Sequence, residues 1–227
     1  MEVKTILSPN FNKGRKLNGK PCGITRITPH CIVGQVSAET CADWFSQKSR
    51  QASATYIIGK SGEVVYNVEE VNRPWTSSSP ENDNQAITIE CASDARAPYA
   101  FNGAVFHTLI ELTADIIKRN LRDTLVWIPD RDKALAYQVK DNEMLITLHR
   151  WFAAKECPGQ WLIDHMQEYV DAVNAITQPK QVPGESQASS GHGMYKVQVG
   201  AFRDRNNAEK LANELKGKGY SVWIQEV

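Results

Sequence analysis

The chain has 227 residues, of which 26 are basic and 26 acidic, so its formal net charge is zero. This balance, without a long run of one sign, argues against electrostatic capture of nucleic acid or of an anionic membrane surface. The length fits one domain of ordinary size with a smaller appendage.

Two features of the chain bear on where it is made. The first residues, MEVKTILSPNFNKGRK, hold no apolar stretch of signal-peptide length, and no run of about 18 apolar residues occurs anywhere. We therefore expect a protein that is made in the cytoplasm without a signal peptide and that binds no membrane. The five cysteines are odd in number and unevenly spaced. Without a secretory signal, this pattern indicates free thiols or a metal ligand, not a disulfide framework.

The first part of the chain predicts strands and then helices. Strand-like runs and one short helix alternate in the order strand, strand, helix, strand, strand, strand, at residues 4–8, 23–30, 38–47, 54–59, 63–68 and 85–92. Residues 103–120 and 161–176 then show apolar side chains at helical spacing. These side chains are Val105, Leu109, Leu112 and Ile116, followed by Leu162, Met166, Tyr169, Val173 and Ile176. The pattern predicts an α/β fold with a mixed central sheet flanked by helices.

A change of composition divides the chain. Residues 178–193, QPKQVPGESQASSGHG, contain two prolines, three glycines and three serines and almost no apolar side chain. Such a segment cannot pack, so we interpret it as a flexible linker between domains at 1–177 and 194–227. The tail alternates apolar residues at both ends, and Asp204 can cap a helix between them. It predicts a small βαβ unit.

Three stretches carry reactive side chains. In HRWFAAKECPGQW, His149 lies eight residues before Cys157, and Pro158-Gly159 forces a turn that can bring the thiolate back toward the imidazole. A catalytic zinc ion usually takes three protein ligands and keeps a fourth position for water. His30, at the end of a predicted strand, is the candidate for the third ligand.

Strand alternation separates neighbouring side chains at the ends of two strands. In GITRITPHC, His30 and Cys31 point to opposite faces, so only one of them can serve a given site. In AITIECA, Glu90 lies on the face opposite to Cys91. A carboxylate in such an apolar strand is costly to bury without a task or a partner. Cys31 and Cys91 are expected to be small buried hydrophobes.

Four segments occur in the order, and at roughly the spacing, of one enzyme family: ITPHC, SATYIIGKSGEVV, NRPWTSSSPENDNQAITIECAS and TLHRWFAAKECPG. Over about residues 1–176 the chain resembles the zinc-dependent N-acetylmuramoyl-L-alanine amidases related to peptidoglycan recognition proteins, above all the enzymatic domains of phage endolysins. The resemblance implies Zn²⁺ ligands at His30, His149 and Cys157 and a catalytic glutamate at Glu90. Lys155 matches a lysine that phage-type members place two residues before the cysteine.

The resemblance also implies a reaction. The enzyme would hydrolyse peptidoglycan at the amide bond between N-acetylmuramic acid and L-alanine. Zinc would polarise the carbonyl and activate water, Glu90 would carry the proton, and Lys155 would stabilise the oxyanion. Two departures, CPGQ for the more usual CPGD and His-Cys for the frequent His-His, touch no proposed ligand.

The biological setting and the class of protein leave alternatives. A phage endolysin would leave the cytoplasm through holin-type pores and lyse the bacterium, whereas a host enzyme would remodel the wall. A non-catalytic peptidoglycan-binding protein of the same superfamily is the alternative to an enzyme. Such proteins typically lack the cysteine ligand, which Cys157 supplies here.

Other polar and aromatic residues receive weaker assignments. Trp75, in the loop NRPWTSSS, is a candidate for lining the substrate groove, although packing is nearly as frequent a role for a loop aromatic. The histidines outside the three motifs, His107, His165 and His192, are expected to be structural or exposed. Cys22 and Cys41 show no role.

The tail resembles part of a second family. YKVQVGAF followed by NAEKLANELKGKGY is similar to the first half of a SPOR domain, a ferredoxin-like module that binds glycan strands stripped of their peptides. A complete SPOR domain repeats the strand-helix-strand unit, whereas this chain stops after one. Because an unpaired central strand is an aggregation hazard, we expect two copies to pair as a homodimer. A truncated or disordered tail is the alternative.

Overall fold

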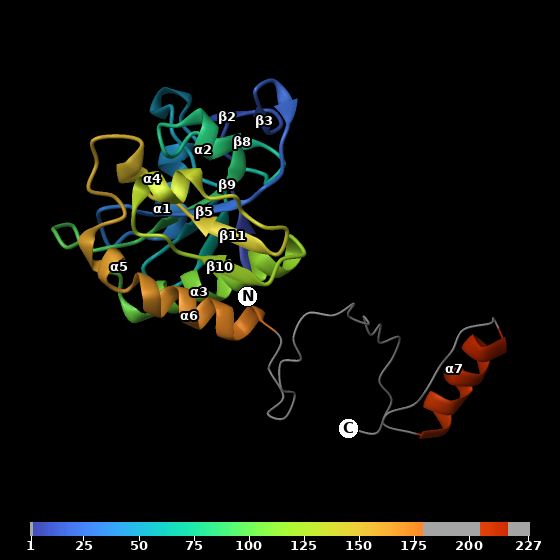
Figure 1. Cartoon of the computed structure of the whole chain (residues 1–227). Coiled ribbons are helices and arrows are strands. Elements are labelled where there is room, and N and C mark those ends of the chain that lie inside the picture. Colours follow the sequence, from blue (N-terminus) through green and yellow to red (C-terminus); the bar gives the residue numbers. More distant parts are fainter. Residues whose placement is uncertain (1, 179–204, 218–227) are drawn as a thin grey trace. The chain divides into compact units, whose positions relative to one another are not determined.

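A computed structural model describes residues 2–178 and 205–217 (Figure 1). The chain divides into two units, residues 1–180 and 181–227, which are described separately. In the second unit the described part is helix α7 (Arg205–Gly217), which agrees with the helix expected in the tail. The linker and the two strands expected on either side of α7 lie outside the described residues. Among the described helices, none is long and apolar enough to span a membrane.

The first unit is built on a seven-stranded mixed sheet. Its strands lie in the order β1-β7-β6-β9-β5-β11-β10, and every neighbouring pair is parallel except β6 and β7. In chain order the strands are β1 (Val3–Thr5), β5 (Arg26–Cys31), β6 (Tyr56–Ile58), β7 (Val64–Tyr66), β9 (Ala86–Cys91), β10 (Thr124–Val126) and β11 (Glu143–Ile146). The expectation of a mixed sheet flanked by helices is confirmed.

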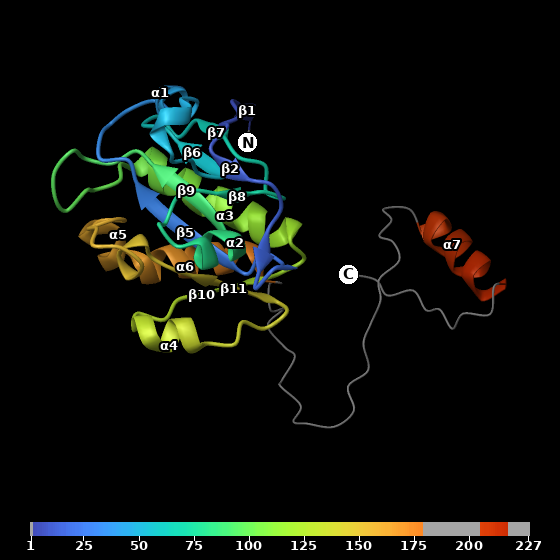
Figure 2. The ribbon, with the colours of Figure 1, turned by 90° about the horizontal axis from the view of Figure 1, so that it is seen from above.

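Helices cover both faces of this sheet (Figure 2). On one face, α3 (Gly103–Arg119) and α6 (Met166–Thr177) pack against each other and against the larger apolar core. On the other face, α1 (Ala38–Phe45) packs on β6 and β7 with a smaller apolar cluster. Strand alternation explains the division, since Ile58 belongs to the first cluster and its neighbour Ile57 to the second.

Short elements complete the unit. Two small antiparallel sheets pair β2 (Phe11–Asn12) with β8 (Arg73–Pro74) and β3 (Lys16–Leu17) with β4 (Lys20–Pro21). The remaining helices are α2 (Pro80–Gln85), α4 (Arg131–Ala136) and α5 (Gln160–Asp164), with 3₁₀ turns η1 (Lys48–Arg50) and η2 (His149–Trp151). Side-chain caps fix several starts, because Ser37, Ser79, Asn102 and Asp130 each accept a hydrogen bond from the backbone N–H three residues on.

The expectation of a single helix over residues 161–176 is wrong in two respects. The segment forms α5 and α6, which meet at His165, where φ is −98° and ψ is 9°. The His165 ring stacks on Trp161 at a centroid distance of 4.0 Å, and its Nδ1 lies 2.8 Å from the Trp161 carbonyl oxygen. In addition, Ile176, expected in the apolar stripe, is 44% exposed, whereas Thr177 is buried. The other expected members of the stripe, Leu162, Met166, Tyr169 and Val173, are buried, so only its last position differs.

A layer of threonines lies within the α1 face of the sheet. We call Thr28, Thr55, Thr76, Thr88 and Thr147 the threonine layer. Thr28 and Thr147 hydroxyls lie 2.7 Å apart and join β5 to the end of β11. The Asn82 amide donates to Thr28 at 3.0 Å and accepts from Thr147 at 2.9 Å. Thr88 bonds to Thr76 at 2.9 Å and to the Thr55 backbone at 3.1 Å. These hydroxyls therefore fix the register of the central strands.

Substitution of Asn82, which bonds to two members of the threonine layer, tests how much the layer contributes to stability. It is fully buried, and Asn82→Ala leaves the Thr28 and Thr147 hydroxyls without their amide partner. We expect the free energy of unfolding to fall by roughly 2 kcal/mol, measured by urea titration of tryptophan fluorescence. Gln85→Ala, on the same helix, removes only a bond to the Glu81 carbonyl and is the control. Equal losses in the two variants would contradict a role for the layer.

Candidate metal centre

His30 and Glu90 lie side by side at the ends of the two central strands. They are register partners in the parallel pair β5 and β9, and both occupy the face that carries the threonine layer. His30 is 1% exposed, and its Nδ1 lies 3.9 Å from Glu90 Oε1. The Glu90 side chain is 14% exposed. Two residues before them, Thr28 and Thr88 are also register partners.

His149 and Cys157 come from one continuous segment beyond β11. His149 begins η2, and its segment is tied to Cys157 by a backbone bond from Arg150 N–H to the Cys157 carbonyl at 3.2 Å. The Arg150 guanidinium also donates to the Glu156 carbonyl at 2.6 Å. These bonds hold the two residues close together although eight positions separate them. The Cys157-Pro158 peptide bond is cis.

Gly159 is required by the close approach of another loop. Its φ is +94°, in the region that favours glycine. A Cβ there would lie 2.7 Å from the Pro98 carbonyl oxygen and 2.8 Å from the Tyr99 Cβ. The Pro98 carbonyl in turn accepts from the Trp161 N–H at 3.1 Å, so the 97–99 loop braces the turn. The Pro-Gly pair of the sequence thus shapes the backbone beside Cys157.

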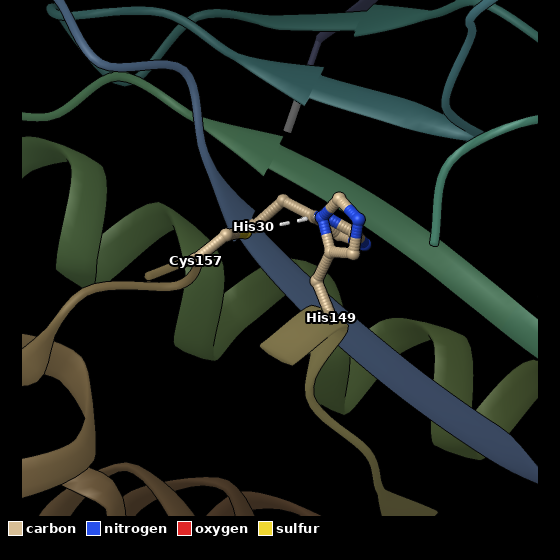
Figure 3. Close-up of side chains that lie close together, drawn as sticks. All are labelled: His30, His149 and Cys157. Atoms are coloured by element: carbon tan, nitrogen blue, oxygen red, sulfur yellow. Dashed lines mark hydrogen bonds between the residues drawn. The ribbon is translucent and has the colours of Figure 1, made fainter. Parts of the chain in front are cut away.

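The structure brings His30, His149 and Cys157 together (Figure 3). The Cys157 Sγ lies 3.3 Å from His30 Nδ1, and the two imidazole centroids are 4.9 Å apart. One potential ligand atom from each residue falls within 4.8 Å of the others. In the part of the chain that the structure describes, no other group of three histidine, cysteine or acidic residues has this geometry.

Burial favours the uncharged forms of all four groups at this centre. Desolvation lowers the pKa of His30 well below its usual value, with a further contribution from His149. Desolvation and the charge of Lys155 lower the pKa of His149. Burial raises the pKa of the Cys157 thiol well above its usual value, and it raises the pKa of Glu90 to about 7. The imidazoles are therefore neutral at neutral pH, the form that binds metals.

The donor set fits a zinc ion. Nε2 of His30 and Nε2 of His149 are buried and have no hydrogen-bond partner among the described residues. Buried polar atoms without partners are rare in folded proteins. Two imidazoles with one cysteine are a ligand set of catalytic zinc sites, and the sulfur disfavours magnesium and calcium, which prefer oxygen.

These residues lie in a groove of about 550 Å³. One side is formed by α1 and η1 with Trp44 and Arg50, and the other by the loop that carries Lys155. Trp75 also lines this groove, and its indole N–H donates to Asn12 Oδ1 at 2.6 Å. Lys155 is exposed at the rim.

Two groove residues escaped the sequence analysis. Arg50 follows α1 in a polar stretch, and its charge lowers the pKa of Glu90 against the effect of burial. Trp44 is 37% exposed on α1. No motif marked either residue, since Trp44 falls within a helical pattern and Arg50 within an ordinary loop.

The remaining histidines and cysteines do not belong to the cluster of three ligand candidates. His107 is exposed on α3 beside Glu111 at 3.3 Å, His165 packs on Trp161, and His192 lies outside the described residues. Cys31 and Cys91 are buried as expected. Cys41 lies beneath the groove on α1, and the Cys22 thiol donates to the Asn84 carbonyl at 3.5 Å.

Comparison with known structures identifies the same fold in an endolysin, a hydrolase and an N-acetylmuramoyl-L-alanine amidase. A mutant endolysin from Bacillus subtilis is 13% identical, with a TM-score of 0.52 over 76% of this chain and 98% of that chain. The hydrolase AmiA from Staphylococcus aureus is 10% identical, with a TM-score of 0.56 over 78% and 83%. The amidase LysC from Clostridium intestinale is 13% identical, with a TM-score of 0.50 over 75% and 98%. At these identities the likeness shows the fold alone.

Comparison with family models identifies the family as well as the fold. No curated protein matches the chain. The SPOR domain model matches residues 177–227, in agreement with the resemblance of the tail. The model for N-acetylmuramoyl-L-alanine amidases, Amidase_2, matches residues 19–160, which include all three ligand candidates and Glu90. More than half of the chain is covered by this match, and the chain therefore belongs to the N-acetylmuramoyl-L-alanine amidase family.

Proposed function

We propose that the chain is a zinc-dependent peptidoglycan hydrolase that cleaves the amide bond between N-acetylmuramic acid and L-alanine. The observation that carries the proposal is the convergence of His30, His149 and Cys157 beside the Glu90 carboxyl group in one groove. Membership of the amidase family supplies the bond that is cut. The presence of the Cys157 thiol favours catalysis over binding alone.

The three ligand candidates have the chemistry that the reaction needs. His30, His149 and Cys157 would hold zinc and leave a fourth position open toward the groove. When bound in such a set, zinc acts as a Lewis acid toward a carbonyl and lowers the pKa of water from 15.7 to about 7. The chain's own task is to hold these side chains in place, which the threonine layer and the Arg150 bonds do.

Glu90 is the proposed proton carrier. Its carboxyl group lies at the centre, 3.9 Å from His30 Nδ1. Burial raises its pKa to about 7, while Arg50 pulls the pKa in the opposite direction. A group with a pKa near the working pH can accept a proton from water and return it to the leaving amine. Both directions are needed in one amide hydrolysis.

Two residues of the groove would bind substrate or stabilise charge. Lys155 lies at the rim close enough to His149 for its charge to lower the pKa of that residue. A cation there would stabilise the oxyanion that develops on the amide oxygen. Trp75, anchored by its bond to Asn12, offers an aromatic surface to the substrate.

The organisation of the whole chain follows from this function. We assign residues 1–177 to the catalytic domain, 178–193 to a flexible linker and 194–227 to a half-sized SPOR unit that binds the glycan and pairs with a second copy. The fold shared with endolysins supports a phage lysis enzyme that reaches the wall through holin-type pores. Its partner is then peptidoglycan, with no role for nucleic acid or membrane.

Loss of the thiol should abolish metal binding. In Cys157→Ser a hydroxyl replaces the soft sulfur ligand, so we expect zinc affinity to fall at least about 10-fold and hydrolysis of purified cell wall to be lost with it. Zinc content is measured by atomic emission on the dialysed full-length chain. Cys22→Ser, whose thiol lies at Asn84, should keep both properties. Full zinc content and activity in Cys157→Ser would refute the site.

Replacement of the carboxyl group should separate binding from catalysis. Glu90→Gln keeps the shape of the side chain but not its proton transfer, so we expect the rate of amine release to fall by about 10² to 10⁴ with the zinc content unchanged. Glu111→Gln, half-exposed on α3, is the control and should stay within a factor of about two. Wild-type rates in Glu90→Gln would exclude this residue as the proton carrier, and wall binding without amine release by the wild type would favour a binding protein.

The tail should determine the oligomeric state. We expect the full chain to sediment as a dimer and a chain that ends at Thr177 to sediment as a monomer, because the first unit keeps its own core without the tail. Analytical ultracentrifugation at several concentrations measures both. A monomeric full chain would sink the dimer proposal.

A further inference from the structure

Cys31 is a second thiol at the centre that the proposed reaction does not use. It directly follows His30 at the end of β5 and belongs to the core cluster on the α3 face. Its relative exposure is only 9%, yet it lines the same groove as the ligand candidates. Here the chain has His-Cys where many relatives of the family it resembles have His-His. The thiol is therefore a feature of this chain that the hydrolysis leaves unexplained.

Cys157 lies near both the histidines and the apolar cluster that contains Cys31. Its Sγ is 3.3 Å from His30 Nδ1, and it packs against the cluster that contains Cys31. After burial, Cys31 is among the causes that raise the pKa of the Cys157 thiol, and both residues line the groove. The Cys31 thiol is not among the donor atoms that cluster within 4.8 Å of one another. Cys157 thus belongs to the candidate metal-binding set and also packs against the cluster that contains a second thiol.

The other thiols lack this combination of contact and access. Cys91 is the register partner of Cys31, but it is fully buried, its thiol points to the Ile89 carbonyl at 3.8 Å, and it does not line the groove. Cys41 lines the groove but belongs to the α1 cluster on the opposite face from Cys31. Cys22 lies at Asn84, away from the centre. A small solute in the groove therefore meets Cys31 and Cys157 as a neighbouring pair.

We propose that Cys31 and Cys157 form a redox modification site that a peroxide converts to a disulfide. The Cys157 sulfur attacks one peroxide oxygen, the O–O bond breaks, and a sulfenic acid and one water are formed. The Cys31 sulfur then displaces the hydroxyl group, which leaves as a second water with the remaining thiol proton. The two thiols lose two electrons and hydrogen peroxide gains them.

The disulfide would switch the metal centre off. It consumes the Cys157 thiolate, so His30 and His149 remain as the only two donors of the set. Two imidazoles are too few donors for a stable zinc site, so His30 and His149 alone would not retain the metal. This last step rests on the proposed zinc function, whereas formation of the disulfide depends only on the two thiols. Reduction restores both sulfurs and with them the site.

The test detects the Cys31–Cys157 disulfide directly in the full-length chain. Metal-free and zinc-loaded protein are treated with excess hydrogen peroxide, free thiols are alkylated, and the digest is mapped by mass spectrometry without reduction. Cleavage after lysine, arginine and glutamate separates Cys31 from Cys41, because Glu39 lies between them. We expect a Cys31–Cys157 linked peptide, a loss of two free thiols with a mass decrease of about 2 Da, and release of the bound zinc. A reducing dithiol should reverse all three.

Two variants make the result specific. Cys31→Ala should bind zinc like the wild type, but oxidation should carry its Cys157 to sulfinic acid, so that a dithiol no longer restores zinc binding. Cys31→Ser serves if the alanine variant unfolds, and Cys22→Ser should behave like the wild type. A link from Cys157 to Cys41, no link at all, or reversible zinc loss in Cys31→Ala would overturn the proposal. Because the metal-free chain is mapped as well, a chain that never binds zinc still gives a decisive result.

Discussion

Two hydroxyl groups 2.7 Å apart, those of Thr28 and Thr147, set the geometry on which the centre depends. Each lies two residues before a ligand candidate, Thr28 before His30 and Thr147 before His149. Because Asn82 bonds to both hydroxyls, the ends of β5 and β11 cannot slide past each other without breaking three buried hydrogen bonds. A slip of one residue along a strand would turn His30 to the other face. By fixing the register of β5 and β11, the threonine layer thus brings the His30 and His149 side chains close together.

The burial of the centre also makes the charged forms of its side chains energetically costly. His30 is almost fully enclosed, and burial shifts the pKa values of His30, His149, Cys157 and Glu90 toward their neutral forms. A divalent cation reverses this preference, since it favours the thiolate and the carboxylate. Metal binding and proton release would therefore be linked at this site. The unpartnered imidazole nitrogens are consistent with a centre built around a group that the polypeptide does not itself supply.

Much of the fold could be predicted from local patterns, but its last two strands could not. The five runs before residue 93 and the helix at 103–120 alternate or repeat clearly, and the structure contains them. β10 and β11 are only three and four residues long, and short apolar runs of this kind are ambiguous between helix and strand. The pairing of β11 with β5 is a long-range contact that no local pattern encodes. Without β11, the position of His149 could be proposed only from the resemblance to a family.

Parity along a strand predicted that His30 and Cys31 would serve different surroundings, and within the sheet they do. This alternation separates the surroundings of two side chains only where a different part of the chain covers each face of the sheet. Cys157 comes from the loop after η2, where its sulfur lies 3.3 Å from His30 Nδ1 and packs against the apolar cluster that contains Cys31. The turn that brings it there depends on Gly159, which no other residue could replace without displacing the loop at Pro98 and Tyr99. Residues that point to opposite faces of a strand can therefore share a neighbour at its end, and in the proposed switch a zinc ion and the Cys31 thiol would compete for the Cys157 sulfur.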